Sequence, residues 1–391
     1  MQASYDCIVV GGGPGGAWAA KYAADNGASV LLLEKDREIG IPVRCAEAVG
    51  IAGLEALVET DQRWVSTRIR NAVLLSPDGS EVEIASATDQ GYVLDRKIFD
   101  YDLVRIAAQS GVEVLTKAYV YDLIKPNGAV AGVRVQHLGE KFEIKAKIVI
   151  GADGVESRVG RWAGLRTNIK MRDMESCIQM TLANIKVNPK NIYLYFGRNI
   201  APGGYLWVFP KSENIANIGL GVSGEYTKQK SAKRYLEEFI SKNYPKAAVL
   251  YTVVGGVPCA PTLKKIAANG IMLVGDAAHQ VNPVSGGGIV TAMLAGKIAG
   301  QVAAEAINSK DYSEKKLNRY ALEWHKAAGK NHERFHKIKQ AIYKLTDDDM
   351  NKTAASILKL PPEKRTIANI FKTALVRHPA LILDVVKVYL K

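Results

Sequence analysis

The sequence is poor in the residues that build metal sites and disulfide frameworks. It has only four cysteines among 391 residues, and they are scattered without metal-ligand spacing. The histidines are also few, and the pair four residues apart, His332 and His336, lies on a basic, polar stretch without an evident third ligand. We therefore expect reduced thiols, no disulfide framework and no metal.

Long hydrophobic runs are also missing. The longest candidate, residues 286–307, is interrupted by Lys297 and Glu305, so no transmembrane helix is expected. A glycine-rich motif begins within a few residues of Met1, which leaves no room for a signal peptide. These absences favour a cytoplasmic protein, and the hydrophobic content of 48% is sufficient for a sizeable core.

Acidic residues are outnumbered by basic ones, most of all near the C-terminus. The net charge is +13, and residues 310–391 contain 18 Lys and Arg against 9 Asp and Glu. Such a surface attracts anionic lipid headgroups, acidic proteins or nucleic acid. Basic motifs interleaved with aromatic residues are absent, so no nucleic-acid partner is expected. A solvated charged surface without any partner is the alternative.

The first 35 residues carry the most informative pattern. An apolar run, Cys7 to Val10, is followed by GGGPGG, by a helical pattern of small residues, and by a second apolar run. This order of strand, tight turn, helix and strand is typical of a dinucleotide-binding unit. Its glycines permit the turn, the approach of a pyrophosphate and close helix packing, and a carboxylate at the end of the second strand accepts from ribose. The residues concerned are Gly11, Gly13, Gly15, Gly16 and Glu34.

The remaining segments predict an α/β fold with an insertion. We expect a Rossmann-like dinucleotide-binding domain over residues 1–166, which resumes at residues 263–310 with an apolar strand, a glycine turn and a long helix. Alternating runs over residues 167–262 predict an inserted antiparallel-sheet domain for a substrate. Residues 311–391 show the pattern of a basic helical region.

Two further motifs follow apolar strands. They are GADGVESRVGRWAGL, from Gly151 to Leu165, and VGDAAHQVNPVSGGGI, over residues 274–289. Together with the N-terminal turn, they make the chain resemble the flavoprotein family of aromatic hydroxylases, halogenases and geranylgeranyl reductases over most of its length. The resemblance implies a non-covalently bound FAD.

The resemblance also implies particular contacts to FAD. The carboxylate of Asp276 would accept from the ribityl hydroxyls, and the glycine turn after it would bring N–H groups to the isoalloxazine edge. Arg96 matches the family's LxRxxFD pattern and would lie over the cofactor; a helix-start ion pair with Asp100 is the alternative. Val120 would offer backbone groups to the adenine. Beyond the N-terminal turn, the implied set is Arg44, Cys45, Ala46, Arg96, Val120, Asp153, Gly154, Asp276, Gly286, Gly287, Gly288 and Ile289.

Two local stretches point to one branch of the family. PVRCAEAVG is similar to the Pro-x-x-Cys motif of archaeal-type geranylgeranyl reductases, which puts Cys45 beside the flavin, although the residues after Cys45 depart from the usual pattern. GYLWVFPK resembles their Tyr-x-Trp-x-Phe-Pro motif. Tyr205, Trp207 and Phe209 alternate along a strand, so they share one face and could line an apolar substrate cavity. An ordinary sheet core is the alternative.

The resemblance implies saturation of carbon–carbon double bonds in geranylgeranyl chains of isoprenoid ether phospholipids or their precursors. Cys45 would deliver or relay the proton, or simply pack against the flavin. No second strand–GxGxxG–helix unit is present, so electrons are expected from an external donor: a ferredoxin, a reduced deazaflavin or NAD(P)H.

The predicted location is the cytoplasm, with peripheral contact to the inner face of the cell membrane. A C-terminal apolar face is expected to make this contact, with Ile367, Ile370, Phe371 and Leu375 at helical spacing. Two other functions remain open: a flavin monooxygenase or halogenase, and a flavin electron carrier at the membrane surface.

Overall fold

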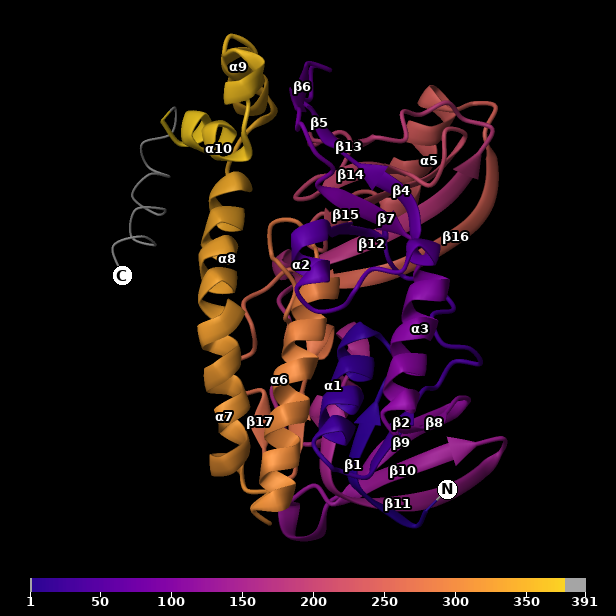
Figure 1. The fold of residues 1–391 in the computed structure, drawn as a ribbon. Coiled ribbons are helices and arrows are strands. Elements are labelled where there is room, and N and C mark those ends of the chain that lie inside the picture. Colours follow the sequence, from indigo (N-terminus) through magenta and orange to yellow (C-terminus); the bar gives the residue numbers. More distant parts are fainter. Residues whose placement is uncertain (1, 377–391) are drawn as a thin grey trace. The chain divides into compact units, whose positions relative to one another are not determined.

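The computed structural model describes residues 2–376 (Figure 1). The chain forms two compact units, each assembled from segments that are distant in sequence. Unit 1 contains the chain up to Val43, together with Arg96–Ile169 and Pro258–Glu333; unit 2 contains Arg44–Asp95, Lys170–Val257 and the chain from Arg334 onward. Unit 2 thus extends beyond the predicted insertion, and the predicted C-terminal region divides between the units.

Unit 1 is a layered α/β structure around a largely parallel sheet. Its strands are β1 (Ser4–Val10), β2 (Val30–Leu33), β8 (Glu113–Leu115), β9 (Ala118–Ile124), β10 (Gly132–His137), β11 (Glu140–Gly151), β17 (Ala267–Ala268) and β18 (Ile271–Leu273). The order is β17-β18-β11-β1-β2-β8, and β9 and β10 extend β11 as an antiparallel meander. β1 is buried from Cys7 to Val10 and pairs in parallel on both sides, as this apolar run predicts.

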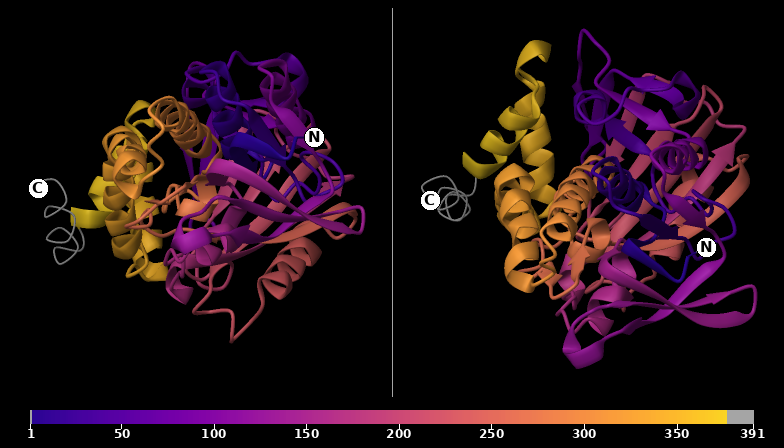
Figure 2. Two further views of the ribbon diagram at one scale, coloured as in Figure 1. Left: turned by 90° about the horizontal axis from the view of Figure 1, so that it is seen from below. Right: turned by 60° about the horizontal axis from the view of Figure 1, so that its bottom comes forward.

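Two helices of unit 1 meet through glycines. They are α1 (Pro14–Asp25) and α6 (Ile289–Asn308). The unit also contains α3 (Arg96–Gln109), α4 (Arg158–Trp162) and α7 (Glu314–Trp324). Both views in Figure 2 agree with the close contact of α1 and α6. A Cβ atom on Gly296 would lie 2.2 Å from the Gly15 carbonyl oxygen. This packing anchors the return segment on the first helix.

Unit 2 is built on a mixed sheet. Its strands are β3 (Ala48–Gly50), β4 (Val65–Ile69), β5 (Asn71–Leu75), β6 (Glu81–Ile84), β7 (Gly91–Leu94), β12 (Met174–Ala183), β13 (Asn191–Tyr195), β14 (Tyr205–Pro210), β15 (Ile215–Ser223) and β16 (Ala248–Pro258). The larger sheet has the order β16-β12-β15-β14-β13-β5-β6, and β3-β7-β4 form a small second sheet. The hairpin β5–β6 joins the larger sheet through a parallel pairing of β5 with β13.

One face of the larger sheet is covered by α5 (Ala232–Asn243). The Ser231 side chain caps its N-terminus by accepting from the Arg234 N–H group. Leu236 is fully buried in a core of aliphatic side chains from β12, β14 and β15. The opposite face of the same strands is therefore the one available to a site.

The C-terminal helices are α8 (Lys330–Ile342), α9 (Asp347–Leu358) and α10 (Ile367–Val376), and the short α2 (Ile51–Glu55) lies earlier in the chain. Part of the predicted apolar face of α10 packs within unit 2, whereas Ile367 is exposed and the Leu375 side chain lies outside what the structure describes. Ile370 packs against Val82 and Ile357, and Ala374 is buried in another cluster. Within residues 2–376, no helix is long and apolar enough to cross a membrane.

Candidate functional site

The glycine turn after β1 leaves open space where a phosphate group would approach. Gly11 has a φ of +110°, and a Cβ on it would lie 2.3 Å from the Ala152 carbonyl oxygen. A Cβ on Gly16 would lie 1.9 Å from the Gly11 carbonyl oxygen, so neither glycine tolerates a side chain. Gly13 is different, because nothing lies within 4 Å of its would-be Cβ. The start of α1 also has no side-chain cap and no acidic residue, which suits an anion.

Glu34 is fixed at the end of β2. Its Oε2 atom accepts from the Gly12 N–H at 2.8 Å, and its Oε1 atom accepts from the Asp36 N–H at 2.9 Å. A carboxylate has further lone pairs, so ribose hydroxyls can still donate to it. The Glu34 carbonyl accepts from Ala118 at the start of β9. Val120 is buried two residues farther along this strand.

One of the two carboxylate oxygens of Asp153 accepts no hydrogen bond from the described part of the protein. Its Oδ2 atom accepts from the Val159 N–H at 2.9 Å, whereas Oδ1 is buried and has no hydrogen-bond partner in the described part of the chain. Burial raises the pKa of this carboxyl group above its ordinary value. Gly154 has a φ of +73°, and nothing lies within 4 Å of its would-be Cβ. A buried acceptor of this kind fits a hydroxyl-bearing ligand.

Asp276 and Arg96 belong to the same unit and interact electrostatically. Withdrawal from water raises the pKa of Asp276 to about 6, and the positive charge of Arg96 partly opposes this rise. Arg96 also makes the alternative contact considered above, because its guanidinium donates to both oxygens of Asp100, at 2.6 and 2.7 Å. The ion pair therefore holds Arg96 in place without excluding a role beside a ligand.

Two backbone N–H groups of the glycine turn before α6 already donate hydrogen bonds within the turn. The Gly286 N–H donates to the Asn282 carbonyl at 2.9 Å, and the Gly287 N–H donates to Ser285 Oγ at 3.2 Å. α6 begins without a side-chain cap and without an acidic residue in its first turn. Gly288 and Ile289 are therefore the better candidates for donating to the edge of a flavin.

In unit 2, the loop around Cys45 is tied down by a strained residue. Glu47 is 4% exposed and has a φ of +73°, which is unusual for a residue with a side chain. Its N–H donates to Cys45 Sγ at 3.2 Å. Its carboxylate accepts from Lys211 Nζ at 2.8 Å and from Asn217 Nδ2 at 2.6 Å. Backbone strain held by such contacts is frequent at functional sites.

The three aromatic residues form one row on β14, as predicted. The ring centroids of Tyr205 and Trp207 are 5.9 Å apart, and those of Trp207 and Phe209 are 6.3 Å apart. Trp207 and Phe209 are 8% and 6% exposed, and they pack in one cluster with Ala46 and other apolar residues of unit 2. The loop after Cys45 therefore lies against the aromatic row.

A single amide connects the two predicted motifs of unit 2. Gln179 on β12 accepts from the Trp207 indole N–H at 2.9 Å through Oε1, and donates to the Cys45 carbonyl at 3.0 Å through Nε2. The indole reaches Gln179 across Gly219, where a Cβ would lie 2.6 Å from the ring. Cys45 and the aromatic row thus have a fixed relative position.

Sequence reasoning missed four residues of this arrangement. Glu47 and Lys211 fall inside the two recognised stretches, so the motifs themselves contained a signal for them. Gln179 and Asn217 lie on other strands and carry no local signal. Arg44, which was predicted to contact FAD, has an exposed side chain.

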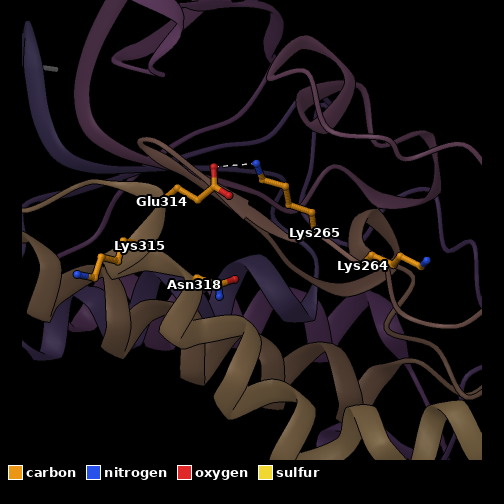
Figure 3. Close-up of a pocket in the computed structure, with 5 residues that line it drawn as sticks. All are labelled: Lys264, Lys265, Glu314, Lys315 and Asn318. Atoms are coloured by element: carbon orange, nitrogen blue, oxygen red, sulfur yellow. Dashed lines mark hydrogen bonds and ion pairs between the residues drawn. The ribbon is translucent and has the colours of Figure 1, made fainter.

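A surface pocket in unit 1 is lined by Lys264, Lys265, Glu314, Lys315 and Asn318 (Figure 3), and contains none of the predicted site residues. Its carboxylate is already paired with Lys265 at 2.7 Å. No cluster of His, Cys, Asp and Glu suited to a metal occurs within the described chain.

Comparisons with known proteins agree with both units. Residues 9–63 match the NAD(P)-binding Rossmann-like domain, and residues 173–257 match the geranylgeranyl reductase catalytic domain. A digeranylgeranylglycerophospholipid reductase of Methanocella arvoryzae is 45% identical, over 99% of each chain. A second one, from Methanococcoides burtonii, is 44% identical, over 98% of this chain and 95% of that protein.

Solved structures show the same fold. A geranylgeranyl bacteriochlorophyll reductase-like protein of Thermoplasma acidophilum superposes with a TM-score of 0.92 at 36% identity, over 98% of this chain and 99% of that one. A flavin-dependent brominase shares the fold only, with a TM-score of 0.71 at 16% identity, over 96% of this chain and 99% of that one. The chain belongs to the geranylgeranyl reductase family, and its fold is that of flavin-dependent enzymes.

Proposed function

We propose that the protein is an FAD-dependent reductase that saturates the double bonds of geranylgeranyl chains in a glycerophospholipid. The named activity of relatives that match nearly the whole chain supports this substrate class. The observation that carries the proposal is the joining of Cys45 to the aromatic row through Gln179. A thiol held at a fixed distance from aromatic rings suits protonation of an apolar chain better than capture of a polar molecule.

The residues of unit 1 fit the cofactor. The open space at Gly13 and the uncapped start of α1 would receive the pyrophosphate, and Glu34 would accept from the adenosine ribose. Asp153 and Asp276, which are both buried, would accept from hydroxyl groups, and Gly288 and Ile289 would donate to the flavin edge. When bound and reduced, FAD supplies a hydride to one alkene carbon.

The protein's own groups have three tasks in this reaction. Cys45 holds a proton for the second alkene carbon, and the Glu47 N–H group directed at Sγ stabilises the thiolate that remains. The aromatic row excludes water and offers ring faces to positive charge that develops on the alkene. Gln179 keeps Cys45 and the aromatic row at a constant relative position while successive double bonds of the substrate are reduced.

Electrons come from outside the protein in this proposal, because the chain offers one dinucleotide unit. The donor is a ferredoxin, a reduced deazaflavin or NAD(P)H. The net charge of +13 suits an acidic protein donor. We place the enzyme in the cytoplasm, in peripheral contact with the inner face of the membrane that holds its substrate.

The proposal is tested by mass spectrometry of lipids. Purified protein is incubated with digeranylgeranylglyceryl phospholipid and dithionite, which bypasses the physiological donor. A ladder of products, each heavier by one pair of hydrogens, is the expected result. An unchanged lipid in the presence of bound, reduced flavin would contradict the proposed substrate. Consumption of NAD(P)H and oxygen in place of lipid reduction would identify a monooxygenase instead.

Cys45→Ala and Cys45→Ser test the proton donor separately. Both variants are expected to keep FAD, as measured by absorbance, and to lose about 100-fold or more of the turnover, because a positioned acid typically contributes this much. Full turnover in either variant, with FAD retained, would show that Cys45 only packs against the ring.

A further inference from the structure

The exposed apolar side chains of unit 2 are concentrated on one strand. Val249, Leu250, Tyr251 and Val254 are 52%, 59%, 40% and 64% exposed, and all four lie on β16. The other exposed large apolar residues in the described chain are scattered. Single exposed apolar residues are normal on a protein surface, whereas a cluster marks a surface of interaction.

β16 is also a sheet edge without the usual protection. It is the last strand in the order of the larger sheet, and runs along the rim of that sheet in Figure 1. Edge strands commonly carry lysine or another charge that discourages association, but residues 248–258 contain no charged residue. Because side chains alternate, Leu250 and Val254 lie on one face of the strand, and Val249 and Tyr251 lie on the other. The occupant must therefore cover apolar groups on both faces.

Positive charge precedes the apolar strand. Residues 239–258 contain no acidic residue and two lysines, Lys242 at the end of α5 and Lys246 in the loop before β16. Both side chains are exposed, and neither forms an ion pair with any residue of the described chain. Lysines beside exposed apolar groups are complementary to a layer of anionic headgroups over hydrocarbon.

We propose that β16, together with Lys242 and Lys246, is the surface by which this protein docks on an anionic lipid bilayer. This inference rests on the proposed function in one respect, because a phospholipid substrate gives the enzyme a reason to reach a membrane. The interfacial zone of a bilayer surrounds an inserted strand from both faces and keeps its free backbone groups hydrated. A folded protein partner would cover one face or the edge. Tyr251 suits the headgroup level, where aromatic rings with a polar tip gather.

The test is sedimentation of the full-length protein with vesicles made of equal parts phosphatidylglycerol and phosphatidylcholine. The double variant Leu250→Glu/Val254→Glu is expected to lose roughly 100-fold in vesicle affinity, because two apolar anchors become anions. Lys242→Gln/Lys246→Gln is expected to lose about tenfold, and to make the remaining binding less sensitive to salt. The matched control, Leu138→Glu/Leu322→Glu, changes two exposed leucines of unit 1 and should bind as the unaltered protein does.

Activity separates this inference from the proposed function. The β16 double variant should reduce detergent-solubilised lipid at the unaltered rate, and vesicle-borne lipid much more slowly. Equal vesicle binding by the β16 variant and the control would overturn the docking surface while leaving the reductase intact. An unaltered protein that is dimeric by light scattering, and monomeric after the β16 substitutions, would assign the strand to a second copy instead. Vesicle binding without any lipid reduction would leave the docking surface standing and remove the proposed substrate.

Discussion

Gln179 joins the cysteine loop to the aromatic row. Its amide makes one hydrogen bond to the Trp207 indole and one to the Cys45 carbonyl. Gln179→Met preserves the length of the side chain and removes both bonds. We expect FAD content to be unchanged and the maximal rate of lipid reduction to fall roughly 10- to 100-fold, because small displacements of a reacting group are costly.

Peptide-resolved alkylation gives a readout that does not depend on turnover. Release of the loop should make Cys45 react faster with iodoacetamide in Gln179→Met than in the unaltered protein. Ser176→Ala, on the same strand, serves as the control and should change neither measurement. A normal rate and a normal alkylation profile in Gln179→Met would assign the amide to structural packing alone.

At this scale, sequence patterns singled out Cys45 and the aromatic row but not the residues that hold them in position. Cys45 and Trp207 stand in motifs, and the alternation of β14 places its aromatic rings on one face. Gln179 lies 134 residues from the carbonyl that it contacts, and its importance depends on the register of three strands. Single-sequence patterns carry no information about such register, so Gln179 became visible only in the fold.

At the scale of elements, two glycines of the first turn are expected to respond differently to the same substitution. Gly16→Ala places a methyl group against the Gly11 carbonyl, and should lower the free energy of unfolding of unit 1 by about 3 kcal/mol. Gly13→Ala meets no protein atom and should leave that free energy nearly unchanged. It should nevertheless weaken FAD binding, because the methyl group enters the space left for the pyrophosphate.

Thermal unfolding of the apoprotein and fluorescence titration with FAD measure these two effects independently. The contrast between the variants is the informative quantity. If Gly13→Ala bound FAD as tightly as the unaltered protein, the open space beside Gly13 would not be the phosphate site. If Gly16→Ala were as stable as the unaltered protein, the close packing of α1 against the turn would not limit its stability.

The periodicity of apolar residues predicted where elements lie in the sequence, but it did not predict which elements pack against each other. The long helix predicted after the glycine turn is α6, which runs from Ile289 to Asn308. The apolar face of α10 was also predicted, and its residue Ile370 packs against Val82 and Ile357, so at least this side chain has a partner within unit 2. A hydrophobic stripe predicts burial without naming what covers it. The same limitation left β5 and β6 outside the predicted insertion, although both strands belong to the larger sheet of unit 2.

At the scale of the whole molecule, a buried histidine makes stability depend on pH. His332 is 2% exposed, its Nδ1 atom has no partner in residues 2–376, and its ring meets Trp324 edge-on. Burial lowers the pKa of His332 to about 4. The unfolded chain binds this proton near the ordinary pKa of about 6.5, so stability is fully present above that value and declines as pH falls toward 4.

Urea unfolding at two pH values checks this dependence. Between about pH 7 and about pH 5, the contribution of His332 to the free energy of unfolding should fall by about 2 kcal/mol. His332→Leu removes the titrating group, and should lose correspondingly less stability over the same interval. His325→Leu, which changes an exposed histidine of the same unit, should retain the dependence of the unaltered protein. Identical pH profiles for the two variants would exclude His332 as the cause.

Unit 1 is assembled from segments that are far apart in sequence, and this order affects when it can fold during synthesis. β1 pairs in parallel with β11, β11 pairs with β18, and α1 packs along α6, so the earliest residues of unit 1 have partners that are synthesised near the end. A nascent chain must reach Asn308 before the glycine-lined side of α1 is covered along its full contact. Until then, apolar side chains of α1 and β1 remain exposed on the nascent chain. We therefore expect the glycine-rich turn of unit 1 to reach its folded geometry only late in translation.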